Sequence, residues 1–260
     1  GMDCTVTNFG ESGYVSTQEV VTLMLELQKG NIPDLVIFYD GINDIYSAYQ
    51  QRVAGLPQNE FRRVDQFDQG NPSIADQSKR ILLERLMPQL STTRLFKNIG
   101  KYLGLRTITE FRTVNDGGPG VPSDWSDKTL VRAVRSIYFS NVETVTALGE
   151  HYHFRSLFYL QPTILQKRHL TRYEQSKRDA MDDAMVVFFN EAYGSFRRSE
   201  PSLDRSPSLR DLSLSFQKFL DPVYIDWFHL SEVGNGMVAR RMFEDVRLAV
   251  QKGTISLGRH

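Results

Sequence analysis

The sequence predicts an α/β domain of three layers, in which helices cover both faces of a mostly parallel sheet. The run Leu-Val-Ile-Phe-Tyr at 35–39 is short, β-branched and aromatic, and turn-forming residues lie on both sides of it. Such a run is typical of a strand buried on both faces of a parallel sheet. A second run of this kind occupies 157–160, and apolar residues recur at helical spacing before and after each run. Strands that alternate with helices favour a parallel sheet.

Composition sets the outer limits of this prediction. The 260 residues are 40% hydrophobic and 24% charged, enough for one large domain with a substantial core. The 31 basic and 31 acidic residues leave no net charge, so we expect neither a nucleic-acid nor an anionic-membrane partner. We expect a soluble chain, because no apolar run is long enough to span a membrane. Cys4 stands alone, permits no internal disulfide and leaves the compartment undetermined.

The amino-terminal part predicts one β-α-β unit. Thr5 to Asn8 suit a short strand, and a glycine-containing turn follows. Ser16 to Glu19 read as a capping box, and the helix they begin should end at Lys29-Gly30. A right-handed crossover to the strand at 35–39 would place the turns near Gly13 and Gly41 at one edge of the sheet.

The rest of the chain supplies an insertion and further layers. Segment 47–126 is long for a connection, and we expect it to form a helical, cap-like insertion within a single domain over 1–260. After it we expect elements in this order: a helix over 131–148, the strand at 157–160, a helix with a Met and Phe core stripe over 181–196, a half-exposed strand at 212–216, a last strand at 223–225 and a final helix that includes Val238 and Val246.

Polar residues follow two of these strands closely. Asn43 and Asp44 come just after 35–39, where open α/β sheets bind ligands. Asp226 and His229 come just after 223–225, so that Asp226 could orient the imidazole while the other ring nitrogen faces a pocket. The spacing therefore predicts a general acid–base pair. Ser231 and Glu232 would begin the final helix, with Ser231 as its cap.

Two blocks carry a resemblance to a known family. Gly41-Ile42-Asn43-Asp44 resembles the Gly-x-Asn-Asp block of the SGNH (GDSL-type) esterases and acylhydrolases, and Asp226-Trp227-Phe228-His229 resembles their Asp-x-x-His block. The resemblance covers nearly the whole chain apart from 47–126. It implies a flavodoxin-like SGNH hydrolase fold that cleaves or transfers an acyl ester by serine chemistry, with no metal or organic cofactor. The implied substrate is a small ester or a glycan acyl ester, including carbohydrate O-acetyl groups.

The resemblance also implies residue roles. His229 would be the general base and then the acid, and Asp226 would orient it. Asn43 would donate its amide to an oxyanion, and the backbone N–H of Gly13 would be the second donor. Asp44 would brace the loop. The expected catalytic set is therefore His229, Asp226, Asn43 and Gly13.

The chain departs from the family where the nucleophile should be. No strand ending in Gly-Asp-Ser precedes the second block. Gly10-Glu11-Ser12 is an alternative first block with Ser12 as nucleophile, but Ser12 lies only 31 positions before Asn43, which leaves no room for a second block. In the family's strand order, 2-1-3-4-5, the central strand would be absent. We therefore expect the strands at 5–8 and 35–39 to pair directly, or to meet a second copy in a homodimer.

Other interpretations remain open at this point. The same residues would serve an O-acetyltransferase, or a non-catalytic binding domain that lost the nucleophile. A flavodoxin-like phosphate site is disfavoured, because no Gly-rich phosphate loop is present. His151 and His153 read as a helix-to-strand connection rather than a metal site, because no further ligands lie at metal-site spacing.

Overall fold

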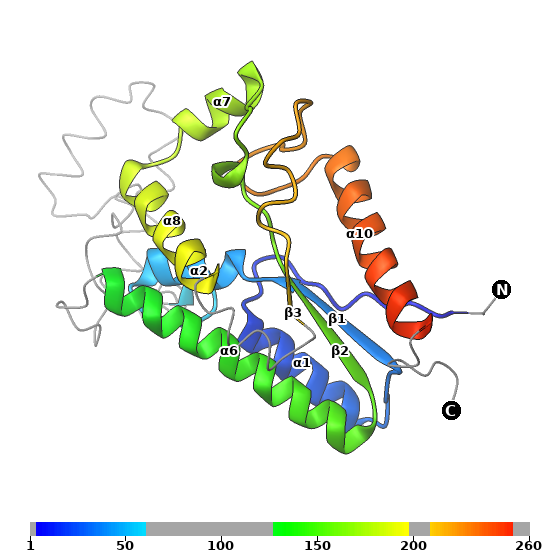
Figure 1. The fold of residues 1–260 in the computed structure, drawn as a ribbon. Helices are drawn as coiled ribbons and strands as arrows, with labels where there is room; N and C mark the ends of the chain where they lie inside the picture. Colours follow the sequence, from blue (N-terminus) through cyan, green and yellow to red (C-terminus); the bar gives the residue numbers. More distant parts are fainter. Residues whose placement is uncertain (1–3, 61–126, 198–208, 252–260) are drawn as a thin grey trace, which may run out of the picture. The chain divides into compact units, whose positions relative to one another are not determined.

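The structure, a computed structural model, describes residues 4–60, 127–197 and 209–251 (Figure 1). The chain divides into two compact units, one made of Gly1–Gln58 with Pro122–His260 and the other of Asn59–Val121, and only the first is considered below. Nearly all of the expected cap-like insertion lies outside the described residues. The single-domain prediction therefore remains a prediction.

Three parallel strands form the sheet: β1 (Leu35–Asp40), β2 (Arg155–Leu160) and β3 (Leu209–Asp211), in the order β1-β2-β3. Their last residues lie level, because Asp40 and Asp211 both stand opposite Leu160. The rings of Phe38 and Phe158 stack across β1 and β2 with centroids 4.8 Å apart. The carboxyl ends of all three strands thus meet at one edge of the sheet.

The helices of the described chain are α1 (Ser16–Gln28), α2 (Ile42–Gln51), α6 (Asp127–Tyr152), α7 (Arg172–Asp179), α8 (Asp183–Arg197) and α10 (Glu232–Gln251), with a 3-10 turn, η2 (Ile164–Gln166). Figure 1 shows α1 and α6 on one side of the sheet and α10 on the other. Fully buried aromatic rings of Tyr138, Tyr193, Phe188 and Phe189 fill the core beneath α6 and α8. The predicted α/β class is confirmed.

Most expected elements form where the hydrophobic pattern placed them. The strands at 35–39 and 157–160 and the helices on either side of them are confirmed. The Met and Phe stripe of α8 is core, as predicted: Met185, Phe188, Phe189 and Phe196 are all buried. In these segments the burial of one apolar face outweighs the other contributions to stability, so the pattern alone is sufficient.

Three short strands were misplaced. Residues 5–8 are exposed and have no regular structure, so their predicted pairing with 35–39 is wrong. The carboxyl-terminal strand of the sheet is 209–211 rather than 212–216. Residues 223–225 contribute only an antiparallel bridge between Tyr224 and Leu230. Segments this short are fixed by partners elsewhere in the fold, which local sequence does not specify.

Strand β1 is less buried than the sequence predicts. Ile37 is 45% exposed, whereas Phe38 is 6% exposed. Within the described residues β1 lies at the edge of the sheet, next to β2 only. The expectation of burial on both faces therefore fails at Ile37.

The expected capping box of α1 is shifted by one residue. The cap is Val15, whose N–H donates to Gln18 Oε1 at 3.2 Å. Ser16 is instead the first helical residue, and its N–H and hydroxyl both donate to the Asp44 carboxylate, the hydroxyl at 2.5 Å. Ser16 therefore joins the start of α1 to the first turn of α2, and the bracing role expected of Asp44 is confirmed.

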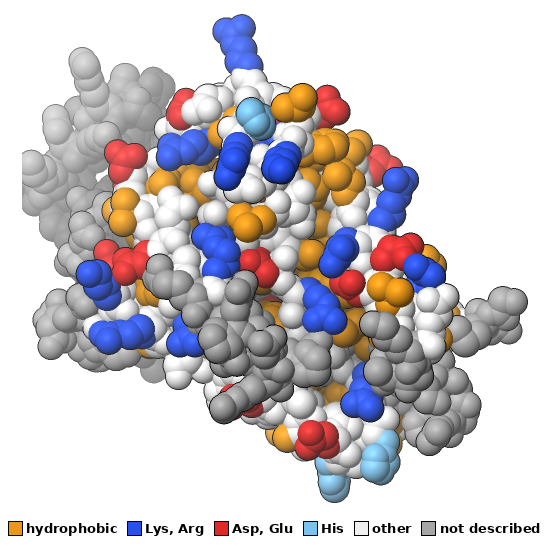
Figure 2. Space-filling view, in the orientation of Figure 1, with side chains coloured by type: hydrophobic (Ala, Val, Ile, Leu, Met, Phe, Trp, Pro, Cys, Tyr) orange, Lys and Arg blue, Asp and Glu red, His pale blue; other side chains and the backbone are white. Residues whose placement is uncertain are grey.

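The surface carries mixed charge. Basic and acidic side chains are interspersed on the face seen in Figure 2, with hydrophobic side chains between them. None of the helices in the described ranges is long and apolar enough to cross a membrane.

Candidate functional site

The loop between Tyr224 and Leu230 holds Asp226 and His229 in direct contact. Asp226 Oδ2 lies 2.7 Å from His229 Nδ1. Asp226 Oδ1 accepts from the backbone N–H groups of Phe228 at 3.0 Å and His229 at 2.8 Å. When the imidazole is neutral, an Nδ1–H donated to the carboxylate leaves Nε2 with a free lone pair. The pair therefore has the geometry of a base and its orienting group.

The charge of Asp226 suits this arrangement. Partial burial raises the pKa of its carboxyl group, but the hydrogen bonds from the backbone and ring of His229 and from the Phe228 N–H outweigh burial. The resulting pKa lies below the ordinary aspartate value, so Asp226 is a carboxylate at neutral pH. The His229 side chain is 67% exposed, and its ring is open to small solutes.

Short-range hydrogen bonds explain why the loop takes this shape. Ile225 N–H donates to His229 O at 2.8 Å, and Ser231 N–H donates to Val223 O at 2.7 Å. Ser231 Oγ then accepts from Gly234 N–H at 3.3 Å, which confirms Ser231 as the cap of α10. A Cβ at Gly234 would lie 2.9 Å from Val223 O, so a glycine there allows α10 to approach the loop closely.

Three aromatic rings lie beside the Asp226–His229 pair. The Phe228 ring lies 4.5 Å from the imidazole, between centroids. The Tyr46 ring of α2 lies 6.1 Å from Trp227 and 6.3 Å from Phe228. We call Tyr46, Trp227 and Phe228 the aromatic wall. It offers an apolar surface next to a base, and it connects α2 with the histidine loop.

Asn43 and Gly13, the two expected oxyanion donors, meet through a third residue. Asn43 Oδ1 accepts from Gln58 Nε2 at 2.9 Å. Gly13 has φ +79°, and a Cβ at Gly13 would lie 3.2 Å from Gln58 Oε1. Gln58 thus joins the turn before α1 to the start of α2. No sequence pattern indicates Gln58, because it follows α2 in an irregular segment.

The structure links Asn43 with the histidine loop only indirectly. Asn43 and Tyr46 lie three residues apart on α2, and hence on one face of that helix. Tyr46 contacts Trp227 and Phe228, but no hydrogen bond joins Asn43 to His229 among the described residues. Ser12 is exposed in the turn before α1, and it too has no hydrogen bond to His229 in the described chain. The catalytic roles of all four residues therefore remain proposals.

A buried carboxyl cluster lies at the same end of β1. Asp40 is buried and accepts from the Tyr138 hydroxyl at 2.6 Å. Burial and then the nearby charge of Asp44 raise the pKa of Asp40 to about 7. Burial and then the charge of Asp40 raise the pKa of Glu19 to about 10, and the two carboxyl groups are hydrogen-bonded to each other. Glu19 therefore carries the proton of this pair. The sequence pattern around Glu19 indicates only a helix cap, so the cluster was missed.

Metal binding has no support in the ranges that the structure describes, where no group of three or more His, Cys, Asp or Glu side chains could hold an ion. His151 and His153 lie at the exposed end of α6 and in the turn before β2. Their interpretation as a helix-to-strand connection is confirmed.

The fold and the loop thus define an α/β unit with an Asp–His pair beside aromatic rings. Comparison with known proteins adds only a short similarity. The chain is 29% identical over 100 residues to proteins named ornithine cyclodeaminase from Brucella abortus biovar 1 and Brucella melitensis biotype 1. The match covers 36% of this chain and 28% of those proteins. No family model and no solved structure matches.

These comparisons overturn the assignment to the SGNH (GDSL-type) family. No family model for such esterases matches, and the similarity that exists is to a different kind of enzyme. The predicted serine hydrolase activity on acyl esters is therefore wrong, and the acyltransferase and binding-domain alternatives fall with it. The two four-residue blocks have local explanations, because Asp44 binds Ser16 and Asp226 caps the backbone of its own turn.

Proposed function

We propose that this unit carries an acid–base site, in which Asp226 and His229 move a proton to and from a small-molecule substrate bound against the aromatic wall. The observation that carries the proposal is the 2.7 Å contact between Asp226 Oδ2 and His229 Nδ1. With Asp226 ionised, His229 Nε2 is the atom that takes and returns the proton. The exposed ring and the adjacent Tyr46, Trp227 and Phe228 give a flat substrate somewhere to stack.

Two further residues fit a role in charge stabilisation. We propose that the Asn43 amide and the Gly13 backbone N–H face negative charge that develops on the substrate as the proton leaves. Asn43 Oδ1 already accepts from Gln58, so its Nδ2 is turned away from that contact. Fixed donors of this kind stabilise developing charge without reorganisation. Their position near the end of β1 suits ligand binding at the carboxyl edge of a parallel sheet.

The finer description of the fold belongs with this proposal. We infer a three-layer α/β/α domain of the flavodoxin-like type, with a helical insertion over 47–126. Helices on both sides of three parallel strands support it (Figure 1). A homodimer and the absence of a nucleic-acid partner are likewise proposals.

The proposal is tested with 5-nitrobenzisoxazole, a flat molecule that needs only a base. A base removes its ring C–H proton, the N–O bond breaks, and a coloured nitrile-bearing phenolate forms. The full chain should turn it over faster than an equal concentration of free imidazole. His229→Ala should lower kcat/KM by about 100-fold, within the usual contribution of a general base. Asp226→Asn should give an intermediate loss, because the ring keeps its place but loses the carboxylate.

The matched control is His151→Ala, which removes another exposed imidazole from the end of α6. It should leave turnover unchanged. Equal turnover by wild type and His229→Ala would sink the proposal.

A further inference from the structure

A buried ion pair lies next to the segment that leads into the histidine loop. Lys167 follows η2, Glu174 lies in α7, and both side chains have no exposed surface. Lys167 Nζ donates to Glu174 Oε1 at 2.8 Å and to Glu174 Oε2 at 2.6 Å. Its third contact is the carbonyl oxygen of Asp221, at 2.6 Å. All three donors of the ammonium group are thereby used.

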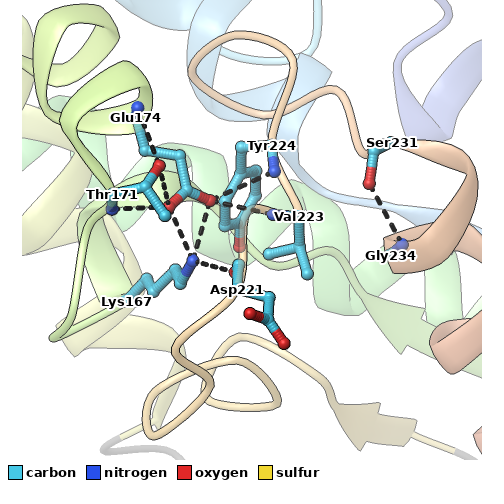
Figure 3. A network of polar contacts seen from close by, with 8 residues as sticks. All are labelled: Lys167, Thr171, Glu174, Asp221, Val223, Tyr224, Ser231 and Gly234. Atoms are coloured by element: carbon cyan, nitrogen blue, oxygen red, sulfur yellow. Dashed lines mark hydrogen bonds and ion pairs between the residues drawn. The ribbon is translucent and has the colours of Figure 1, made fainter.

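The Glu174 carboxylate also binds backbone on the same segment. Its Oε1 accepts from Val223 N–H at 3.0 Å and Tyr224 N–H at 3.3 Å. Its Oε2 accepts from Thr171 N–H at 3.0 Å and from the Thr171 hydroxyl at 3.1 Å. Figure 3 shows the carboxylate between the start of α7 and the strand-like backbone of 221–224. A buried carboxylate with this many donors is fully satisfied.

The contacts converge on the residues just before Asp226. Lys167 and Glu174 bind Asp221, Val223 and Tyr224, and the Tyr173 hydroxyl donates to Ile225 O at 2.7 Å. The bridge between Tyr224 and Leu230 then closes the loop. Both ends of the histidine loop therefore depend on backbone that the ion pair holds.

We propose that Lys167 and Glu174 are positioning residues for His229: they fix the backbone of 221–224 so that Asp226 and the imidazole stay in contact. This inference rests on the proposed function where it concerns turnover, but not where it concerns the order of the loop. Glu174 acts on the reaction only through the loop, since none of its hydrogen bonds reaches Asp226 or His229. A charged pair serves this role because it reaches several backbone groups at once.

The test compares Glu174→Gln with the double variant Lys167→Met/Glu174→Gln. The single variant leaves a buried ammonium group facing an amide, whereas the double variant keeps an amide oxygen for Val223 and Tyr224 and removes both charges. Amide hydrogen exchange at Ile225 and Ser231 is the first readout, because their N–H groups close the loop. Glu174→Gln should speed exchange there by about tenfold or more through local opening, and the double variant should restore part of the protection.

Val145→Ala controls for lost stability, since Val145 is fully buried on α6 and makes none of these loop contacts. It should leave exchange at Ile225 and Ser231 unchanged relative to the core. The ring ¹⁵N spectrum of His229 is the second readout, and Glu174→Gln should reduce the Nδ1–H form. If exchange and ring spectrum in Glu174→Gln match those of Val145→Ala, the positioning role is refuted. Wild type without turnover of 5-nitrobenzisoxazole, together with loosened loop residues in Glu174→Gln, would refute the proposed function and support the positioning role.

Discussion

Replacing Gly41 by alanine should destabilise the protein by about 2–4 kcal/mol, through backbone strain and overpacking together. Gly41 has φ +98° at the junction of β1 and α2, a conformation that side-chain-bearing residues rarely adopt. A Cβ there would lie 2.5 Å from Leu160 Cδ1, and Leu160 is buried on β2. Denaturant unfolding followed by circular dichroism measures the loss.

Gly30→Ala is the matched control for Gly41→Ala. Gly30 also has positive φ, +85°, but a Cβ there meets nothing within 4 Å. Strain alone should cost about 1 kcal/mol at this position. The difference between the two variants is the cost of the contact with Leu160. Equal losses in the two variants would contradict the tight packing of β1 against β2 at Gly41.

Replacing Glu19 by glutamine should make stability less dependent on pH. The folded chain keeps a proton on Glu19 up to about pH 10, whereas the unfolded chain releases it near the ordinary value of 4.5. Between these limits the native state binds more protons than the unfolded state, so the free energy of unfolding falls as pH rises. One proton gives a slope of up to about 1.4 kcal/mol per pH unit.

Glutamine donates permanently to Asp40 and has no proton to lose. The stability of Glu19→Gln relative to wild type should therefore rise by about 1 kcal/mol per pH unit between about pH 5 and about pH 8. The control is Glu143→Gln, because Glu143 is exposed on α6. It should show no such trend. Parallel stability curves for wild type and Glu19→Gln would mean that Glu19 is ionised in the folded state.

The parts of the fold that depend on burial were predictable. Strands β1 and β2 and helices α6, α8 and α10 form where the apolar pattern placed them, because transfer of one face of each from water is the main driving force. The strand at 209–211 was not predictable, because a three-residue strand is set by its partner β2. The buried pair of Lys167 and Glu174 also escaped, since seven residues of sequence separation do not indicate that both charges leave water.

The candidate site was predictable in its parts but not in its family. The three-residue spacing of Asp226 and His229 predicted their contact, and the structure confirms it. The family assignment failed because a short motif reflects local geometry, and an Asp that caps its own turn produces the same four-residue pattern. Gln58, which joins Gly13 to Asn43, depends on where an irregular segment returns in space.

The ring protonation of His229 is the measurement that tests the acid–base site most directly. Two-bond ¹H–¹⁵N NMR of the neutral imidazole distinguishes a proton on Nδ1 from a proton on Nε2. The structure predicts Nδ1–H, held by Asp226 Oδ2 at 2.7 Å, with Nε2 unprotonated and able to act as a base. Asp226→Ala should abolish that preference. A proton on Nε2 in the wild-type protein, or a spectrum that Asp226→Ala leaves unchanged, would contradict the acid–base site.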